Sequence, residues 1–325
     1  MNPLKPIIFS FLTLLLSVPA IADDSTDAFS YAPKVNGTIR TRWEIETQEG
    51  ESRFQVRNAR LSLAGNIAPE ISYFLNTDLC DRGKMKILDA WGRIELGGGA
   101  ALQAGQFRMP FGVDPFRAPH NYYFANRSFI GKQVCNYRAV GAKASCAFSF
   151  FTVEAGVFNP TTIGDHETWN KKVTAAGQVI FKKGEIKAVT GVQSVMVNDV
   201  RANLIDGSIG WSHDRWTVEG EYMHEHFTNN AYKACHAYNL FANYAMPVQA
   251  GIFNRLSFQG RVDGMTRHVE DAGRNRVTLG TTLTYSRAKV FADIRVNYEK
   301  YLYRHNAEGV QGERDKAVVE MVIRF

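Results

Sequence analysis

The sequence from residue 34 onward is a succession of segments of about ten residues in which apolar and polar side chains alternate. In the segment KVFADIRVNYE, for example, Val290, Ile294 and Val296 would share one face of an extended strand. Asp293 and Arg295 would occupy the opposite face, because successive side chains of a strand point to opposite sides. No segment carries a sustained helical period, so the chain is predicted to be all-β.

The number of alternating segments predicts the architecture. Sixteen are counted, with starts near residues 34, 53, 71, 85, 100, 136, 150, 169, 185, 201, 214, 232, 251, 274, 288 and 314. Sixteen is even, as a closed antiparallel barrel of the bacterial outer membrane requires, and tight connections such as GGG and KKG alternate with more polar ones such as MTRHVEDAG. We therefore predict a closed sixteen-stranded transmembrane β-barrel over residues 34–325. Fourteen strands is the alternative, because the boundary around residues 148–151 is obscure.

One segment changes its apolar phase partway along. In FQVRNARLSLAG the apolar positions Phe54 and Val56 are followed by Ala59, which falls on the other parity. An extra residue in one strand of a pair produces such a change, so we expect a β-bulge near Arg57 and Asn58.

The N-terminus predicts export. Lys5 precedes an apolar run over residues 7–18, and the small residues up to Ala22 form a signal-peptidase site. The run is short for a membrane helix of about 20 residues. Residues 1–22 are therefore predicted to be a cleaved signal peptide, and residues 23–33 a short lead into the barrel.

A soluble β-sandwich also has alternating strands and is the main alternative fold. The charges on the polar strand faces would need partners in a soluble core, whereas the wet interior of a barrel accepts them. Aromatic residues recur near segment ends, as they do in the girdles at the two membrane interfaces: Trp43, Trp169, Trp211, Trp216, Tyr244, Tyr285 and Tyr298. These features favour the membrane barrel, with outer-membrane lipid around it.

Charge and motifs narrow the function classes. The formal net charge of +6 is mild and the basic residues are scattered, so no nucleic-acid partner is predicted. The sequence contains no HExxH, no GxSxG and no phosphate-cradling glycine loop, so neither a cofactor nor an enzymatic activity is expected. Two alternatives are a structural barrel with a plugged lumen and a barrel enzyme at the rim, whose candidate histidines are His166, His224, His226 and His236.

Several blocks of sequence resemble one family. FQVRNARLSLAGNIAPEISYFLNTDL is followed by LDAWGRIELGGGAALQAGQFRMPFG and then by ANRSFIG and YRAVGAKASC. Together they resemble the phosphate-selective porin O and P family, most strongly over residues 53–145. The terminal strand ending in Phe325 resembles the recognition signal for the barrel-assembly machinery. Where relatives often have Arg-Asp, this chain has Arg138-Ala139. This is a departure from the family pattern on which the expectation of phosphate selectivity rests.

The resemblance implies a homotrimeric outer-membrane porin for passive diffusion of small solutes, with anions such as phosphate or polyphosphate favoured. It also implies a third loop folded into the pore, which here would be residues 110–135. A general, non-selective porin is the alternative, since the predicted inner wall carries charges of both signs. Carboxylates expected there include Glu44, Asp78, Asp263, Asp293 and Glu320.

The candidate pore residues are basic, because a partly dehydrated anion must be solvated at the narrowest point. The third loop contributes Arg117, Arg127 and Lys132 against the single acid Asp114. The alternative is that these charges lie on a solvated external loop. The predicted inner wall contributes Arg40, Arg42, Arg57, Arg60, Arg93 and Lys143.

Histidines and cysteines give two further expectations. His224, His226 and His236 would lie near one another across a hairpin and form a possible zinc site, but interfacial rim residues are the favoured interpretation, so no metal is predicted. Cys80 and Cys135 fall at external strand ends and are the favoured disulfide pair, although four cysteines allow three pairings.

Overall fold

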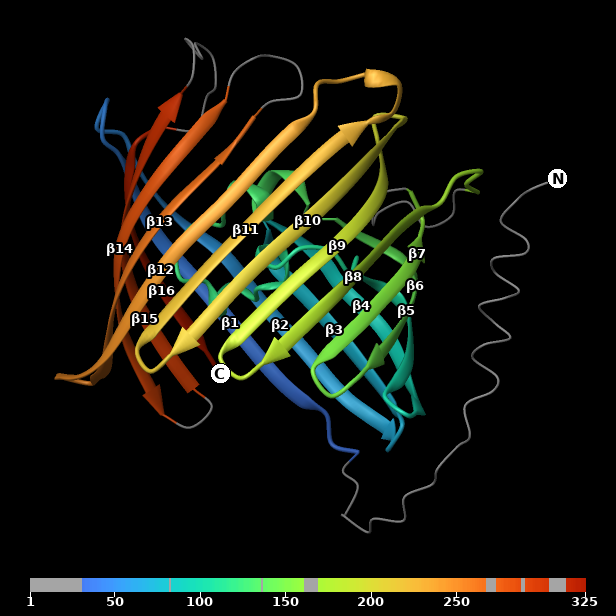
Figure 1. Ribbon diagram of the computed structural model, residues 1–325. Coiled ribbons are helices and arrows are strands. Elements are labelled where there is room, and N and C mark those ends of the chain that lie inside the picture. The colour runs from blue at the N-terminus through green and yellow to red at the C-terminus, as the bar shows by residue number, and fades with distance from the viewer. Residues whose placement is uncertain are drawn as a thin grey trace.

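The chain folds into a closed antiparallel β-barrel of sixteen strands (Figure 1). The computed structural model describes residues 31–81, 83–135, 137–160, 169–266, 273–287, 290–303 and 314–325. Strands pair in chain order, and the first strand pairs with the last. The predicted sixteen-stranded barrel is confirmed, and both fourteen strands and a β-sandwich are wrong. The expected signal peptide lies outside the described residues.

The strands are β1 (Lys34–Glu46), β2 (Ser52–Ala68), β3 (Ile71–Asp81), β4 (Lys84–Gly97), β5 (Ala100–Arg108), β6 (Arg138–Ala147), β7 (Phe151–Phe158), β8 (Thr174–Lys183), β9 (Ile186–Val197), β10 (Val200–His213), β11 (Trp216–Phe227), β12 (Cys235–Ala250), β13 (Phe253–Met265), β14 (Arg274–Arg287), β15 (Val290–Tyr303) and β16 (Lys316–Arg324). The described connections contain four short helical turns: η1 (Asp114–Phe116), η2 (Pro119–Asn121), η3 (Ile130–Val134) and η4 (Thr228–Asn230). Each predicted segment start lies within five residues of the observed one.

Pairing between β1 and β16 closes the barrel. The register runs from Thr38 opposite Arg324 to Glu46 opposite Lys316. Beyond it, the backbone N–H of Gly37 donates to the Phe325 carbonyl at 2.7 Å, and the return bond is 3.2 Å. Closure leaves no strand edge exposed, which is what lipid demands because it offers backbone groups no hydrogen-bond partner.

The expected bulge lies in β2. Arg40 of β1 is opposite Asn58, but the next residue, Thr41, is opposite Val56. Arg57 is therefore the extra residue of β2, and the prediction is confirmed.

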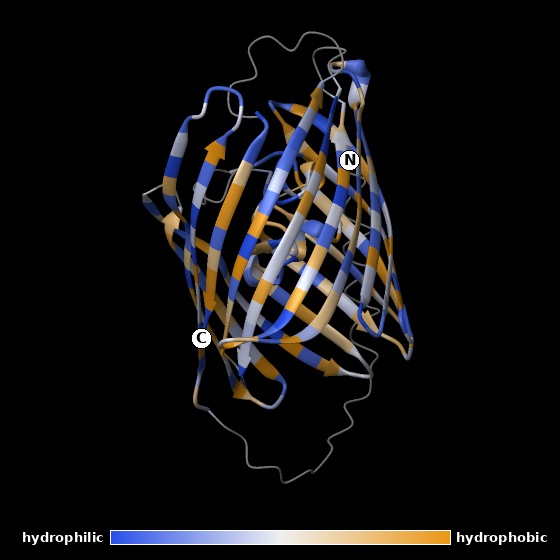
Figure 2. Cartoon of the chain, turned by 90° about the vertical axis from the view of Figure 1, so that its left-hand side faces the viewer, coloured by the Kyte–Doolittle hydropathy of each residue, from blue (hydrophilic) through white to orange (hydrophobic). Residues whose placement is uncertain are grey.

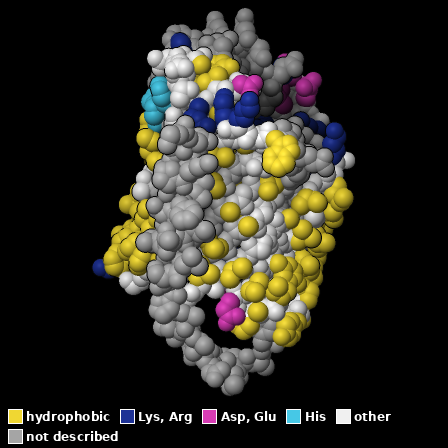
Figure 3. Space-filling view, turned by 90° about the vertical axis from the view of Figure 1, so that its right-hand side faces the viewer, with side chains coloured by type: hydrophobic (Ala, Val, Ile, Leu, Met, Phe, Trp, Pro, Cys, Tyr) yellow, Lys and Arg dark blue, Asp and Glu magenta, His cyan; other side chains and the backbone are white. Residues whose placement is uncertain are grey.

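The alternation of the sequence gives the barrel two different faces. Hydrophobic and hydrophilic residues alternate along most strands (Figure 2). On the face that Figure 3 shows, hydrophobic side chains are spread over the middle and lower part of the outer surface. Outward residues such as Ile209 and Leu279 are exposed, whereas inward charged residues such as Arg295 and Glu320 are almost completely buried. Among the described residues, no helix is long and apolar enough to span a membrane.

The two ends of the barrel also differ. The described connections nearest the C-terminus, such as residues 98–99 and 214–215, are tight turns, whereas the opposite end carries the longest described connections, between β5 and β6 and between β11 and β12 (Figure 1). In outer-membrane barrels the short turns face the periplasm. The longest described connection, between β5 and β6, lies inside the barrel with η1, η2 and η3 (Figure 1).

The expected disulfide between Cys80 and Cys135 is not present. All four cysteines are free thiols. Cys135 is buried in the apolar cluster beneath the β5–β6 connection, beside residues such as Met109 and Phe111. Cys80 lies on the barrel wall, where its Sγ is 3.9 Å from the Val56 carbonyl. The prediction was wrong because the inward fold of the connection carries Cys135 away from the rim.

Candidate functional site

The β5–β6 connection, residues 109–137, closes one side of the lumen by binding carboxylates of the wall. The backbone N–H groups of Val113 and Asp114 donate to Glu221 of β11, at 2.6 and 3.1 Å. The N–H of Phe129 donates to Asp263 of β13 at 2.9 Å. Loop backbone therefore satisfies buried carboxylates that would otherwise cost free energy, and those carboxylates fix the loop.

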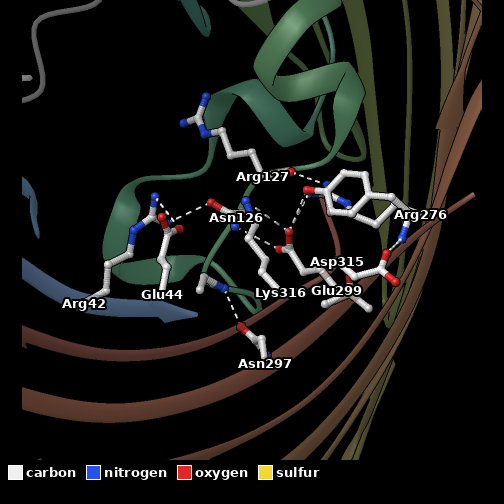
Figure 4. A network of polar contacts seen from close by, with 12 residues as sticks. Arg42, Glu44, Asn126, Arg127, Arg276, Asn297, Glu299, Asp315 and Lys316 are labelled. Atoms are coloured by element: carbon white, nitrogen blue, oxygen red, sulfur yellow. Dashed lines mark hydrogen bonds and ion pairs between the residues drawn. The ribbon is translucent and has the colours of Figure 1, made fainter. Parts of the chain in front are cut away.

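Arg276 of β14 is the central clamp of this arrangement (Figure 4). Its guanidinium donates to the Arg127 carbonyl at 2.6 Å and forms ion pairs with Asp263 at 2.8 Å and Glu299 at 3.3 Å. Asn126 of the loop donates to Glu299 at 2.9 Å. Arg276 is only 1% exposed, so it joins the loop backbone to two strands from a buried position.

The first strand holds the same stretch of loop from the other side. Arg40 donates to the Ala125 carbonyl at 2.6 Å. Arg42 donates to the side-chain carbonyl of Asn126 at 2.8 Å (Figure 4). The N–H of Ala125 donates to Asn297 of β15 at 2.7 Å. Residues 125–127 are thus bound to β1, β14 and β15 at once, which fixes the width left between the loop and the remaining wall.

A cavity of about 780 Å³ lies in that remaining space. The wall residues that line it come mainly from β1 to β6, and the opposite side is the loop. Eleven basic side chains line it: Arg40, Arg42, Arg53, Arg57, Arg60, Lys86, Arg108, Arg127, Lys132, Arg138 and Lys316. Within the described residues, Asp78 is the only carboxylate of the lining.

Carboxylates behind this lining compensate part of its charge. Arg40 pairs with Glu320 at 2.6 Å, Arg42 with Glu44 at 3.0 Å, and Arg138 with Asp89 at 2.9 Å. The basic side chains therefore line the cavity. Their carboxylate partners lie in the barrel wall behind them or on the side of the lumen that the loop closes. The field within the cavity is positive, although weaker than eleven isolated cations would give.

The structure brings six of the nine predicted pore residues to this cavity: Arg40, Arg42, Arg57, Arg60, Arg127 and Lys132. The other three do not line it. Arg117 pairs with Glu219 on the closed side of the loop, Arg93 pairs with Glu95 at 2.6 Å, and Lys143 pairs with Glu154 at 2.5 Å.

Five basic lining residues were missed by the sequence analysis: Arg53, Lys86, Arg108, Arg138 and Lys316. Arg108 and Arg138 are directly opposite each other in the β5–β6 register, at the two ends of the loop. A basic residue on each flank of the longest connection was the signal that could have found them.

Arg127 has a structural role as well as a place in the lining. Its guanidinium donates to the carbonyl of Arg117 at 2.8 Å, to that of Gly131 at 3.3 Å, and to the Tyr122 hydroxyl. It also lies over the Tyr122 ring, 4.8 Å from the centroid. A substitution at Arg127 therefore alters the conformation of the loop together with its charge.

Two ionisable groups of the loop are held in fixed states. Burial, followed by the guanidinium groups of Arg324 and Arg295, lowers the pKa of His120 to about 4. Burial acts to raise the pKa of Asp114, but Arg117 and other nearby donors hold that pKa below its usual value. At neutral pH, His120 is uncharged and Asp114 is ionised.

The described residues include no group of three or more His, Cys, Asp or Glu side chains that could hold a metal ion. The lumen offers charge and hydrogen-bond donors instead.

A family model, phosphate-selective porin O and P, matches residues 40–221, more than half of the chain. The chain belongs to this family. It is a porin of the bacterial outer membrane, and its lumen is a channel. No curated protein matches the sequence.

Solved porin structures share the fold at low identity. An anion-selective porin from Comamonas acidovorans has a TM-score of 0.66 and 14% identity, covering 90% of this chain and 98% of that one. The trimer form of OmpT from Vibrio cholerae has a TM-score of 0.62 and 11% identity, covering 90% of this chain and 98% of that one. The outer membrane channel DcaP of Acinetobacter baumannii has a TM-score of 0.63 and 8% identity, covering 90% of this chain and 97% of that one.

Proposed function

We propose that this porin passes small anions, such as phosphate or polyphosphate, through the basic cavity beside the third loop. The observation that carries the proposal is the lining itself, in which eleven basic side chains accompany one carboxylate. The fold shared with an anion-selective porin from Comamonas acidovorans supports it. The non-selective alternative rested on mixed charge in the wall, but many wall carboxylates lie behind the lining or under the loop.

Arginine suits this role chemically. Its planar guanidinium presents several donors to the oxygens of an oxyanion and stays charged at any physiological pH. An ion must also leave the site, so the binding at each position has to be moderate. Carboxylate partners such as Glu44 and Asp89 weaken the attraction of individual arginines in this way.

The remaining roles follow from the same proposal. No catalytic function is proposed, because charge and donors at the constriction suffice for diffusion. A homotrimer is proposed in line with the trimer form of the Vibrio cholerae protein. The terminal strand up to Phe325 is proposed as the signal read by the barrel-assembly machinery.

Reversal potentials in planar bilayers test the function directly. In a potassium chloride gradient, we expect the sign of the reversal potential to show preference for chloride. Phosphate added to one side should reduce the chloride current, because it competes for the same guanidinium groups. Preference for potassium, or equal permeability with no effect of phosphate, would contradict the proposal.

The state of His120 leads to a prediction for pH. Because the pKa of His120 is lowered to about 4, the imidazole stays neutral between pH 8 and pH 5 and adds no charge to the pore. His120 should therefore contribute no step near pH 6.5, the ordinary pKa of histidine, and the anion-to-cation permeability ratio of His120→Gln should follow that of the wild type across this range. A step there that disappears in His120→Gln would show that the imidazole titrates as in water.

A further inference from the structure

A histidine pair lies outside the lumen, on the outward face of β11 and β12. His224 and His236 are directly opposite each other in the register of these two strands. Their Nδ1 atoms are 3.4 Å apart and their ring centroids 4.6 Å apart. Figure 3 shows histidine side chains on the outer surface, above the hydrophobic belt. His224 lies near the end of β11 and His236 near the start of β12, so the pair lies at the end of the barrel opposite the C-terminus.

The separation of the two nitrogens suits a metal ion. Zinc binds imidazole nitrogen at about 2.0–2.1 Å, and tetrahedral angles then place two such nitrogens about 3.4 Å apart. The two rings approach each other through the same atom, Nδ1, and His236 is exposed. A metal ion could bridge them with little rearrangement of either ring.

A third polar atom lies beside His236. The Tyr222 hydroxyl is 2.7 Å from Nδ1 of His236 and belongs to the same outward face of β11. Tyr222 is not counted as a ligand, but its hydroxyl can orient a metal-bound water. His226 follows two residues after His224 on this face, because side chains of a strand alternate.

We propose that His224 and His236 bind one divalent transition-metal ion, such as Zn²⁺ or Cu²⁺, with water in the open coordination positions. The site is separate from the pore, because both side chains face away from the lumen. Two protein ligands make it an exchangeable surface site rather than a closed structural zinc centre. The metal would join β11 to β12 across the strand pair.

Calorimetric titration with Zn²⁺ tests the site on the full barrel, purified in detergent without a histidine tag. We expect one Zn²⁺ per barrel at pH 7.5. Loss of a residue that only orients a ligand weakens metal affinity by about 10- to 100-fold, and Tyr222→Phe should weaken Zn²⁺ affinity by an amount in this range. His224→Ala or His236→Ala removes a ligand and should weaken Zn²⁺ affinity further. Binding should also weaken as the pH falls, because a protonated imidazole cannot ligate.

His213→Ala is the matched control. His213 is an exposed histidine at the other end of the barrel, where it lies beside Glu185, and its loss should leave Zn²⁺ affinity unchanged. The electron paramagnetic resonance spectrum of bound Cu²⁺ should show two nitrogen ligands in the wild type and one in either alanine variant. The proposal is overturned if wild type and the His224→Ala, His236→Ala double variant bind Zn²⁺ equally, or if His213→Ala causes the loss. Both side chains face outward, so we expect each variant to fold. The shift of the unheated protein's band on a gel, relative to the heated protein, verifies that the barrel of each variant is folded.

Discussion

Replacement of both Arg57 and Lys132 by glutamate should lower the anion-to-cation permeability ratio by about tenfold or more at low salt. Both side chains line the cavity, one from β2 and one from the third loop. Two unit charges about 8 Å apart in water interact by about 0.5 kcal/mol. Reversing two charges changes the energy of a passing ion by four such interactions, or about 2 kcal/mol, and about 1.4 kcal/mol corresponds to a factor of ten.

Salt should remove most of this effect. The Debye length is about 30 Å at 0.01 M and about 3 Å at 1 M, so charges about 8 Å from the ion act strongly only in the dilute solution. Reversal potentials at both concentrations measure the difference. An effect of equal size at high salt would point to a changed loop conformation rather than to the field.

The control carries the same change of charge outside the cavity. Arg93 pairs with Glu95 away from the lining, and Lys183 is exposed at the tight turn after β8. The double variant Arg93→Glu, Lys183→Glu should leave the permeability ratio near that of the wild type. If both double variants shift the ratio equally, net charge governs selectivity and the cavity does not.

The strand pattern could be predicted from sequence because the barrel obeys a local rule. Lipid outside and polar contacts inside force alternation on every strand, so the parity of Ile294 and Arg295 is already visible in the chain. Even the bulge at Arg57 leaves a local mark, the change of apolar phase in β2. Only the connections, such as the one before β8, shifted the predicted boundaries by several residues.

The pore residues were harder to predict, because their positions depend on how the third loop packs. Parity correctly placed Arg40 and Arg42 on the inner wall, but it could not tell the closed side of the lumen from the open side. Arg117 was expected in the pore, yet Glu219 holds it on the closed side. Contacts between residues far apart in sequence decide which side of the lumen a side chain reaches. The alternation of apolar and polar residues contains no information about these contacts.

The same long-range contacts predict that Arg276→Ala will release the third loop. The variant removes the clamp on the Arg127 carbonyl and leaves Asp263 and Glu299 with fewer partners. Breaking a buried ion pair from one side costs about 3–5 kcal/mol; here we expect the lower end, because Asp263 keeps Arg261 at 3.2 Å. The temperature at which the folded band is lost on a gel should fall, and single-channel currents should become larger and noisier.

A second variant separates loss of stability from release of the loop. Arg276→Gln combined with Glu299→Gln removes one cation and one anion together, so less buried charge is left unbalanced and much of the thermal stability should return. The loop still lacks the guanidinium that held the Arg127 carbonyl, so the noisy, enlarged current should persist. Arg215→Ala, at an exposed turn, should change neither property. If the current noise falls when thermal stability returns in the double variant, Arg276 acts by stabilising the barrel as a whole. If the noise persists in the stable double variant, Arg276 sets the width of the pore by fixing the loop.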